Sequence, residues 1–148
     1  MLNTLTVLLS IHVLAAALWV GGGFLLNIAM LLAARSGDPA MRLAAMRLAS
    51  FAGPLVFLPL ALVVLLSGAW LTEKYFDWGD LWVVLGLIGL VTASTVGLLY
   101  LTPRTRRAVA GMEQGAPPPS GRNWVPVVGE LNLLLIVAVL VLMVIRPT

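Results

Sequence analysis

The sequence contains no cysteine and only one histidine, His12. The lack of cysteine excludes disulfides, iron–sulfur clusters, thiolate metal sites and thiol nucleophiles. A single histidine also excludes metal centres built from several imidazoles, such as histidine-rich zinc or dicopper sites. A metal-bearing cofactor therefore has at most one imidazole ligand from each chain.

Charged residues are scarce as well: they make up 10% of the 148 residues, against about 25% in an ordinary globular domain. Hydrophobic residues make up 61%, and the mean hydropathy is +1.05. This small number of charges cannot cover the surface of a soluble domain. The sequence therefore predicts an integral membrane protein in contact with the lipid bilayer. The net charge of +3 does not indicate a nucleic-acid partner, because the arginines lie between apolar runs, where basic residues set membrane orientation.

Four apolar segments are long enough to cross about 30 Å of hydrocarbon, which takes roughly 20 helical residues. They cover approximately residues 5–32, 48–71, 81–101 and 125–145. The sequence therefore predicts an all-α fold, a four-transmembrane-helix bundle that forms a single transmembrane domain over residues 1–148. We expect the first segment to be retained and not cleaved as a signal peptide, because no Lys or Arg precedes its apolar run.

Local signals mark the helix ends and the linkers. Asp38 followed by Pro39 is a typical helix start, so the second helix is expected to begin near Pro39, before it enters the membrane. The same helix contains Pro54 and Pro59, each of which removes a helical hydrogen bond and can kink the axis. The longest linker is predicted over residues 102–123 and is expected to be mobile around its three consecutive prolines, residues 117–119.

The basic residues predict the orientation in the membrane. In a four-span protein the first and third linkers share one face. These linkers hold seven of the nine basic residues, namely Arg35, Arg42, Arg47, Arg104, Arg106, Arg107 and Arg122. That face is therefore expected to be cytoplasmic, and both termini extracytoplasmic.

The third span has a stripe of small residues on one helix face, at steps of three and four. It consists of Trp82, Gly86, Gly89, Ala93, Gly97 and Tyr100. Small residues allow close approach of two helix backbones, and a groove for a flat cofactor needs the same small residues, so the stripe does not distinguish these alternatives. A larger side chain at Leu90, which lies off the stripe, is expected to be much less disruptive than one at Gly89.

A second stripe on the first span is the candidate cofactor site, with His12, Trp19, Gly23 and Asn27 as binding residues and His12 as metal ligand. Ala16 and Met30 complete the stripe. Polar residues are costly in lipid, so His12 and Asn27 are expected to point into the bundle. A neutral imidazole is a common axial ligand of haem iron. The alternative is a core histidine that hydrogen-bonds a neighbouring hydroxyl or carbonyl.

Glu130 and Asn132 form a candidate polar site near the start of the fourth span. A carboxylate there can hold a proton or bind a cation, or it can cap its own helix or be solvated near the interface. His12 enters from the opposite face, so the two groups should be separated by on the order of 10 Å or more along the axis. A direct His12–Glu130 pair is therefore not expected.

The stretch from Ile11-His12 to Gly21-Gly22 resembles the first helix of the CopD/HemJ-like bacterial four-helix membrane proteins. The segments 59–70 and 129–147 are similar as well, and the chain is closest to the uncharacterised predicted integral membrane proteins of that group. This resemblance implies a multi-pass protein of the bacterial inner (plasma) membrane. It also implies b-type haem with His12 as axial ligand, with Glu130 matching an acidic residue that opens the fourth helix.

This sequence departs from the family pattern at two places, and both bear on the protoporphyrinogen oxidase activity of the HemJ type. Ala61 stands where the family has a methionine after its second-helix proline, and no lysine follows Trp78, whereas the family has one near the start of the third helix. Copper transport is a rival implied by the same group. Cu(I) prefers Cys, Met and His ligands, and Met30 is the only methionine on the His12 stripe.

Three functional hypotheses follow. The first is a b-haem protein that acts in electron transfer or haem-linked oxidation, with His12 as axial ligand. The second is an accessory or assembly subunit of a larger membrane complex, which binds other membrane subunits or a second copy of itself and has no cofactor of its own. The third is a transporter of copper or a small solute.

Overall fold

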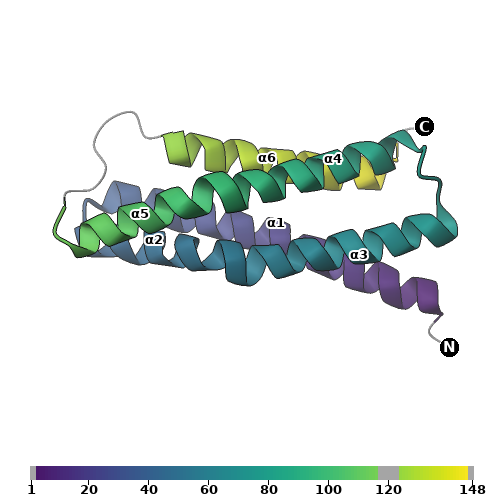
Figure 1. The fold of residues 1–148 in the computed structure, drawn as a ribbon, viewed down its shortest axis with the longest axis horizontal. Coiled ribbons are helices and arrows are strands. Elements are labelled where there is room, and N and C mark those ends of the chain that lie inside the picture. Colours follow the sequence, from purple (N-terminus) through teal and green to yellow (C-terminus); the bar gives the residue numbers. More distant parts are fainter. Residues whose placement is uncertain (1–2, 117–123, 147–148) are drawn as a thin grey trace.

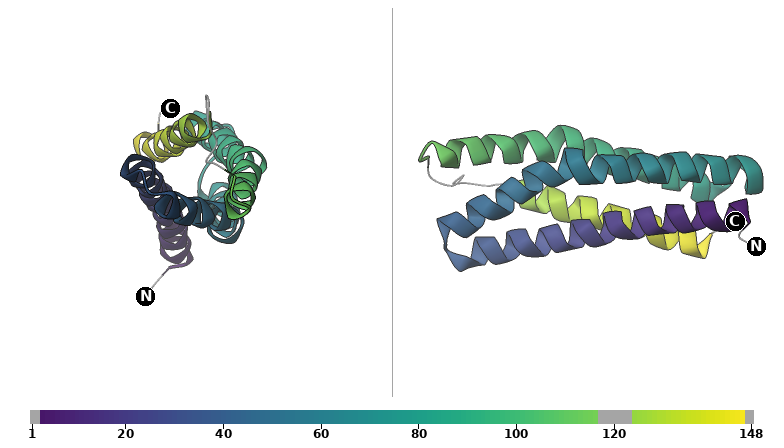
Figure 2. Two further views of the ribbon diagram at one scale, coloured as in Figure 1. Left: turned by 90° about the vertical axis from the view of Figure 1, so that its left-hand side faces the viewer. Right: turned by 90° about the horizontal axis from the view of Figure 1, so that it is seen from below.

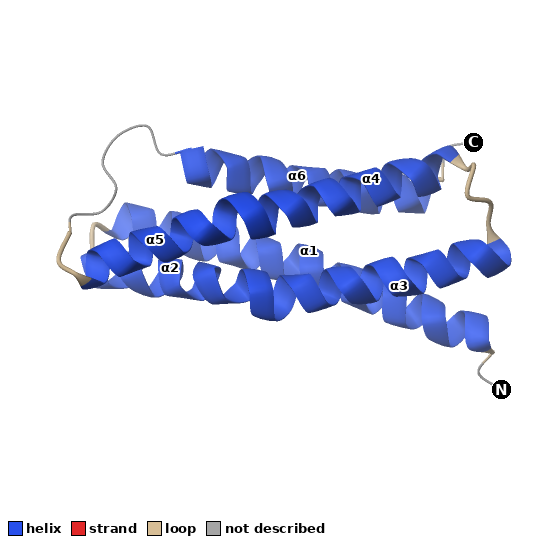
Figure 3. Ribbon diagram, viewed as in Figure 1, coloured by secondary structure: helices blue, strands red, loops and turns tan. Residues whose placement is uncertain are grey.

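Four long helices make up the structure, a computed structural model that describes residues 3–116 and 124–146. Each of the four is long and apolar enough to cross a membrane, and within the described residues there is no strand (Figure 3). The predicted all-α, four-span fold is confirmed. The start of the first helix and the end of the last lie at the same end of the bundle (Figure 1).

The first helix is α1, Thr4–Ser36. Asn3 caps its start, since the Asn3 side chain accepts a hydrogen bond from the Leu5 amide at 2.9 Å. Gly37 ends it with a positive φ of 73°, a conformation that glycine adopts without steric cost. The predicted start of the next helix is confirmed: Asp38 Oδ1 accepts from the Ala40 amide at 2.8 Å, and α2 begins at Pro39.

The second long helix runs without a break from Pro39 to Tyr75. It consists of α2 (Pro39–Ala52), the π-helical segment η1 (Gly53–Phe57) and α3 (Leu58–Tyr75). The prolines at 54 and 59 were expected to kink this helix. Pro54 lies inside the π-helical segment, whose wider turn accommodates a residue that lacks an N–H.

The third long helix differs most from the prediction. It runs from Leu81 to Glu113 as α4 (Leu81–Thr95), the π-helical segment η2 (Val96–Leu101) and α5 (Thr102–Glu113). The prediction of a linker from residue 102 is therefore wrong as far as Glu113. Pro103 lies at the start of α5, and the π-helical segment η2 directly precedes it and lets the helix continue. The predicted mobility around residues 117–119 lies outside the described residues.

The last helix, α6, covers Trp124–Ile145. The helices surround a common axis (Figure 2), with α1 packed mainly on α3, α4 on α6, and α2 on α5. We call the end with the α1–α2 connection and α5 the basic end. It holds Arg35, Arg42, Arg47, Arg104, Arg106 and Arg107.

A small core lies halfway along the bundle, where all four long helices contribute buried side chains. Its buried members are Ala15, Trp19, Ala61, Val64, Leu90, Ala93 and Ile136. Leu90 is only 8% exposed, so a larger side chain there would also meet packed neighbours, although the residue lies off the stripe. Residues beside the stripe are buried as well, because α4 packs against both α6 and α3.

Candidate functional site

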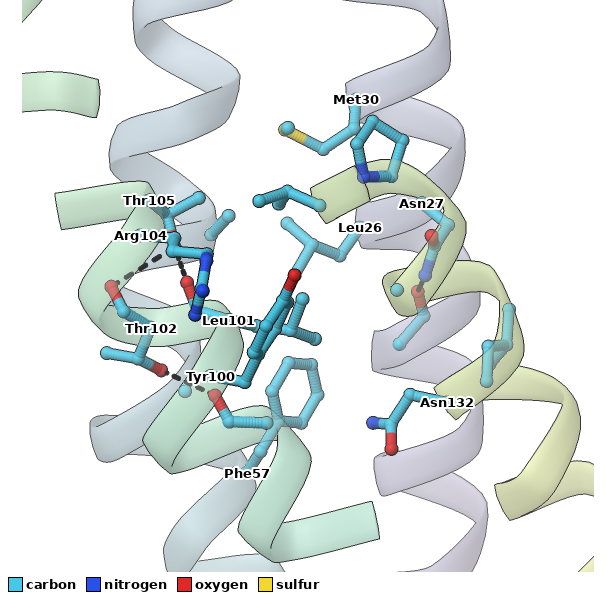
Figure 4. A pocket seen from close by; sticks show the side chains of 18 of the residues that line it. Leu26, Asn27, Met30, Phe57, Tyr100, Leu101, Thr102, Arg104, Thr105 and Asn132 are labelled. Carbon is cyan, nitrogen blue, oxygen red and sulfur yellow. Dashed lines mark hydrogen bonds between the residues drawn. The ribbon is translucent and has the colours of Figure 1, made fainter. Parts of the chain in front are cut away.

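A cavity of about 900 Å³ occupies the half of the bundle between the core and the basic end. All four long helices line it, through residues 19–34, 42–61, 93–108 and 124–136. Most of its wall is apolar. The polar side chains on the wall are Asn27, Arg42, Ser94, Tyr100, Thr102, Arg104, Thr105, Arg107, Glu130 and Asn132 (Figure 4).

The small-residue stripe of the third helix explains where the cavity begins. Gly86 and Gly89 are buried, and a Cβ built on them would collide with the side chains of Met143 and Val139 on α6. A Cβ on Gly97, by contrast, would meet nothing within 4 Å, and Gly97 lies on the cavity wall. The stripe therefore makes a helix contact over α4 and an open cavity wall over η2.

The core closes the cavity at its deep end. Trp19, Ala61, Ala93 and Ile136 line the cavity and also belong to the core. Trp19 is 7% exposed, so its indole is packed against its neighbours and forms the floor.

Within the part of the chain that the structure describes, the arginines of the cavity have no carboxylate partners. Among residues 3–116 and 124–146 the ion pair present is Arg47–Glu113, at 2.7 Å, and neither residue lines the cavity. Arg42 donates instead to the Ala33 and Ala34 carbonyls at the end of α1, at 3.4 and 2.8 Å. The Arg104 guanidinium carbon lies 3.6 Å from the centroid of the Tyr100 ring, a cation–π contact. The positive charges of the wall are thus available to an anion.

Three of the predicted site residues on α1 lie on this cavity: Trp19, Gly23 and Asn27. The Asn27 side-chain amide donates to the Gly23 carbonyl at 2.9 Å. The neighbouring helix α6 contributes Glu130 and Asn132. Glu130 forms no ion pair within the described part of the chain, and the buried Oδ1 of Asn132 has no hydrogen-bond partner there.

His12 lies elsewhere, on the far side of the core. It is seven residues before Trp19, which is about 10 Å along the helix, and it is not part of the cavity wall. Its Nδ1 is 3.0 Å from the Ser67 hydroxyl, and its ring lies against the backbone of Gly68 on α3. The alternative of a histidine bonded to a neighbouring hydroxyl is therefore what the geometry shows. The structure does not bring His12 together with Trp19, Gly23 and Asn27 in one site.

The hydrogen bonds around Ser67 define the imidazole tautomer. The Ser67 hydroxyl lies 2.5 Å from the Val63 carbonyl, to which it donates its proton. Its oxygen must therefore accept from His12, so Nδ1 carries the hydrogen and Nε2 carries the lone pair. An imidazole held in this way suits a metal ligand, although no cluster of three metal-binding side chains occurs among the described residues.

Glu130 and His12 are far apart, as expected. Gly23 contacts Leu133 and Asn27 contacts Gly129, so α1 and α6 run antiparallel with Glu130 near the level of Leu26. The fourteen residues from Leu26 to His12 correspond to about 21 Å along the axis.

Sequence reasoning treated the arginines only as orientation signals and missed Arg42, Arg104 and Arg107 as wall residues. One signal was available: Tyr100 and Arg104 are four residues apart, a spacing that places two side chains on the same helix face. The sequence does not show that this face points into a cavity, because that depends on the helix continuing past Pro103.

The fold and the cavity define a class: a four-helix integral membrane protein with an internal cavity whose wall carries arginines. The chain belongs to the family described as predicted integral membrane protein (DUF2269), whose model matches residues 6–147. The comparisons with curated proteins and with solved structures found no match. The resemblance to CopD/HemJ-like proteins stays a prediction.

Proposed function

We propose that this protein binds an amphipathic anion, a molecule with an apolar body and an acidic head, inside its cavity. The observation that carries the proposal is the set of three wall arginines, Arg42, Arg104 and Arg107, which form no ion pair with a carboxylate of residues 3–116 and 124–146. Charged side chains in a membrane protein face the interior or a cavity and mark a path or binding site for ions and substrates.

The charge balance of the wall favours an anion. Its three arginines stand against a single carboxylate, Glu130. Guanidinium groups hold carboxylate and phosphate oxygens through parallel hydrogen bonds. The Tyr100 ring beneath Arg104 keeps this guanidinium in place, so less freedom is lost when an anion binds.

The apolar floor favours a hydrocarbon body. Beyond the arginines the wall consists mainly of apolar side chains down to Trp19, Ala61 and Ile136. A volume of about 900 Å³ lies within the range of pockets that enclose one ligand of drug size. A single-chain amphiphile with its head at the basic end therefore suits both the size and the polarity.

The test is binding of a single-chain phosphate amphiphile, lysophosphatidate, to protein purified in a neutral maltoside detergent, followed by native mass spectrometry. Arg104→Gln should weaken binding about tenfold or more, since one hydrogen-bonded charge is lost. Arg106→Gln is the matched control: it removes the same charge from the same helix, and Arg106 is exposed like Arg104 but does not line the cavity. Equal losses in both variants, or no binding by the wild type, would refute the proposal.

A second candidate is axial ligation of b-type haem by His12, in electron transfer or haem-linked oxidation. The observation that favours it is the Ser67 hydrogen bond, which leaves the His12 Nε2 lone pair available to iron. His12 would be the sole imidazole ligand, and the haem would lie outside the cavity, because the core separates His12 from it.

The two remaining hypotheses make different predictions. A carrier for a small solute would use the same cavity, so lysophosphatidate binding is compatible with transport of such an amphiphile. An accessory subunit without its own ligand would bind neither lysophosphatidate nor haem. Copper transport receives the least support, since the sequence has no cysteine and Met30 is the only methionine on the His12 stripe.

A further inference from the structure

We infer that the closed floor of the cavity limits the hydrocarbon chain of the ligand to about eight to twelve carbons. This inference rests on the proposed function and narrows its ligand class, from any single-chain acidic amphiphile to one of medium chain length. Trp19 and Gly97 are the residues that set the limit. Both lie on the cavity wall, and neither carries a group that would hold the acidic head.

The floor is closed because two successive layers of buried side chains lie across the bundle. The first layer lines the cavity and consists of Trp19, Ala61, Ala93 and Ile136. The second layer lies about one helical turn further along the bundle and is not part of the cavity wall. It consists of Ala15, Val64 and Leu90. A hydrocarbon chain that reaches the Trp19 indole therefore has no open space ahead of it.

The third long helix gives the distance from the acidic head to the floor. Arg104 is eleven residues from Ala93, which is about 16 Å along the axis. Its guanidinium lies over the ring of Tyr100, and Tyr100 is seven residues, or about 10 Å, from Ala93. An extended alkyl chain advances roughly 1.25 Å per carbon, because its C–C bonds of about 1.5 Å form a zigzag. The space between head and floor thus holds about eight to twelve carbons.

Gly97 keeps the cavity open just above the floor. It lies about one helical turn from Ala93 on the same helix, and a Cβ built on it would meet nothing within 4 Å. A larger side chain at this position would therefore extend into the cavity instead of colliding with another helix. Leucine there would take the space of about one helical turn, which corresponds to about four carbons of the ligand chain.

The experiment measures binding of octyl, dodecyl and hexadecyl phosphate by native mass spectrometry, with protein in a neutral maltoside detergent. In these probes the phosphate is attached directly to the chain, so the chain begins at the arginines. The unbound long-chain probe resides in the detergent micelle, so a methylene group that fits the cavity changes the affinity little and one that does not fit lowers it. We expect the wild type to bind dodecyl phosphate about tenfold or more tightly than hexadecyl phosphate, since four methylene groups find no place.

Two variants should move the limit in opposite directions. Gly97→Leu should weaken binding of dodecyl phosphate about tenfold and leave that of octyl phosphate nearly unchanged. Trp19→Ala removes the indole from the first layer, so the cavity should extend to the second layer and bind hexadecyl phosphate about as tightly as dodecyl phosphate. Gly21→Leu is the matched control. A Cβ on Gly21 also meets nothing within 4 Å, but this glycine does not line the cavity, so the wild-type preference should remain.

The outcomes separate this inference from the proposed function. Wild-type protein that binds hexadecyl phosphate as tightly as dodecyl phosphate, or more tightly, would overturn the inference and leave anion binding in place. A Gly97→Leu variant with the wild-type affinity for dodecyl phosphate would overturn it as well. Binding of none of the alkyl phosphates would refute the proposed function itself. If Trp19→Ala does not fold, the wild type and Gly97→Leu decide the case.

Discussion

The Thr102 hydroxyl lies against the backbone of Gly53, at the level where the second and third long helices are both π-helical. A Cβ built on Gly53 would collide with Thr102 Oγ1. Thr102 donates to the Gly97 carbonyl at 2.9 Å, which satisfies a group inside η2. The second and third long helices thus meet where each has a π-helical turn. From there their segments α2 and α5 continue along the cavity.

This contact predicts that Gly53→Ala destabilises the bundle. The added methyl group has no space beside Thr102, and overpacking typically costs about 1–3 kcal/mol. In the double variant with Thr102→Ala most of the loss should be recovered, because the remaining Thr102 Cβ is 3.6 Å from the new methyl position. Thermal unfolding in detergent measures both effects.

Gly21→Ala is the control for this pair, since a Cβ on Gly21 meets nothing within 4 Å. Alanine also favours the helix over glycine, so the control should unfold at the wild-type temperature or above it. A double variant as unstable as Gly53→Ala would mean that Thr102 is not the obstacle.

Much of the fold could be predicted because its causes are local. The spans follow from the length of apolar runs, and the start of α2 follows from the Asp38 cap and the proline after it. The continuation through Pro103 was missed, because a proline normally ends a helix and the preceding π-helical segment has no clear sequence signature.

The candidate site could be predicted only in part. The helical period places His12, Trp19 and Asn27 on one face of α1, and this is correct as a statement about one helix. What the face contacts changes along its length: His12 meets α3, Trp19 meets the core, and Asn27 meets α6 beside the cavity. A single-helix pattern contains no information on these neighbours.

The contact of α4 with α6 predicts a second packing effect. Gly89→Leu should lower the stability strongly, since Val139 and Leu135 of α6 occupy the space that the new side chain needs. Ile88→Phe is the control, because Ile88 is 56% exposed and faces lipid. Thermal unfolding should separate the two variants, and similar midpoints would contradict the close α4–α6 contact.

The orientation in the membrane gives a third prediction. The basic end should be cytoplasmic and both termini extracytoplasmic. Alkaline phosphatase fused after Thr148 should be active, and green fluorescent protein at the same place should be dark. Fluorescence without phosphatase activity would reverse the orientation and place the mouth of the cavity outside the cytoplasm.

The last prediction concerns haem and His12. If His12 is an axial ligand, protein purified from a haem-replete host should show a Soret band, and His12→Ala should abolish or strongly reduce it. The fold should survive, because alanine is a good helix former and the span lies mainly in lipid. Glu130→Gln should keep the band, since Glu130 lies about 21 Å from His12 along the axis.

Ser67→Ala adds a readout that a purely structural histidine would not give. The substitution removes the acceptor that fixes Nδ1–H, so the imidazole should be less well oriented and the Soret band weaker or shifted, with little change in unfolding temperature. Purified wild type without a Soret band would refute the haem candidate. A normal band in His12→Ala would show that the iron is held by another residue or by a partner chain, so that His12 is a core histidine bonded to Ser67.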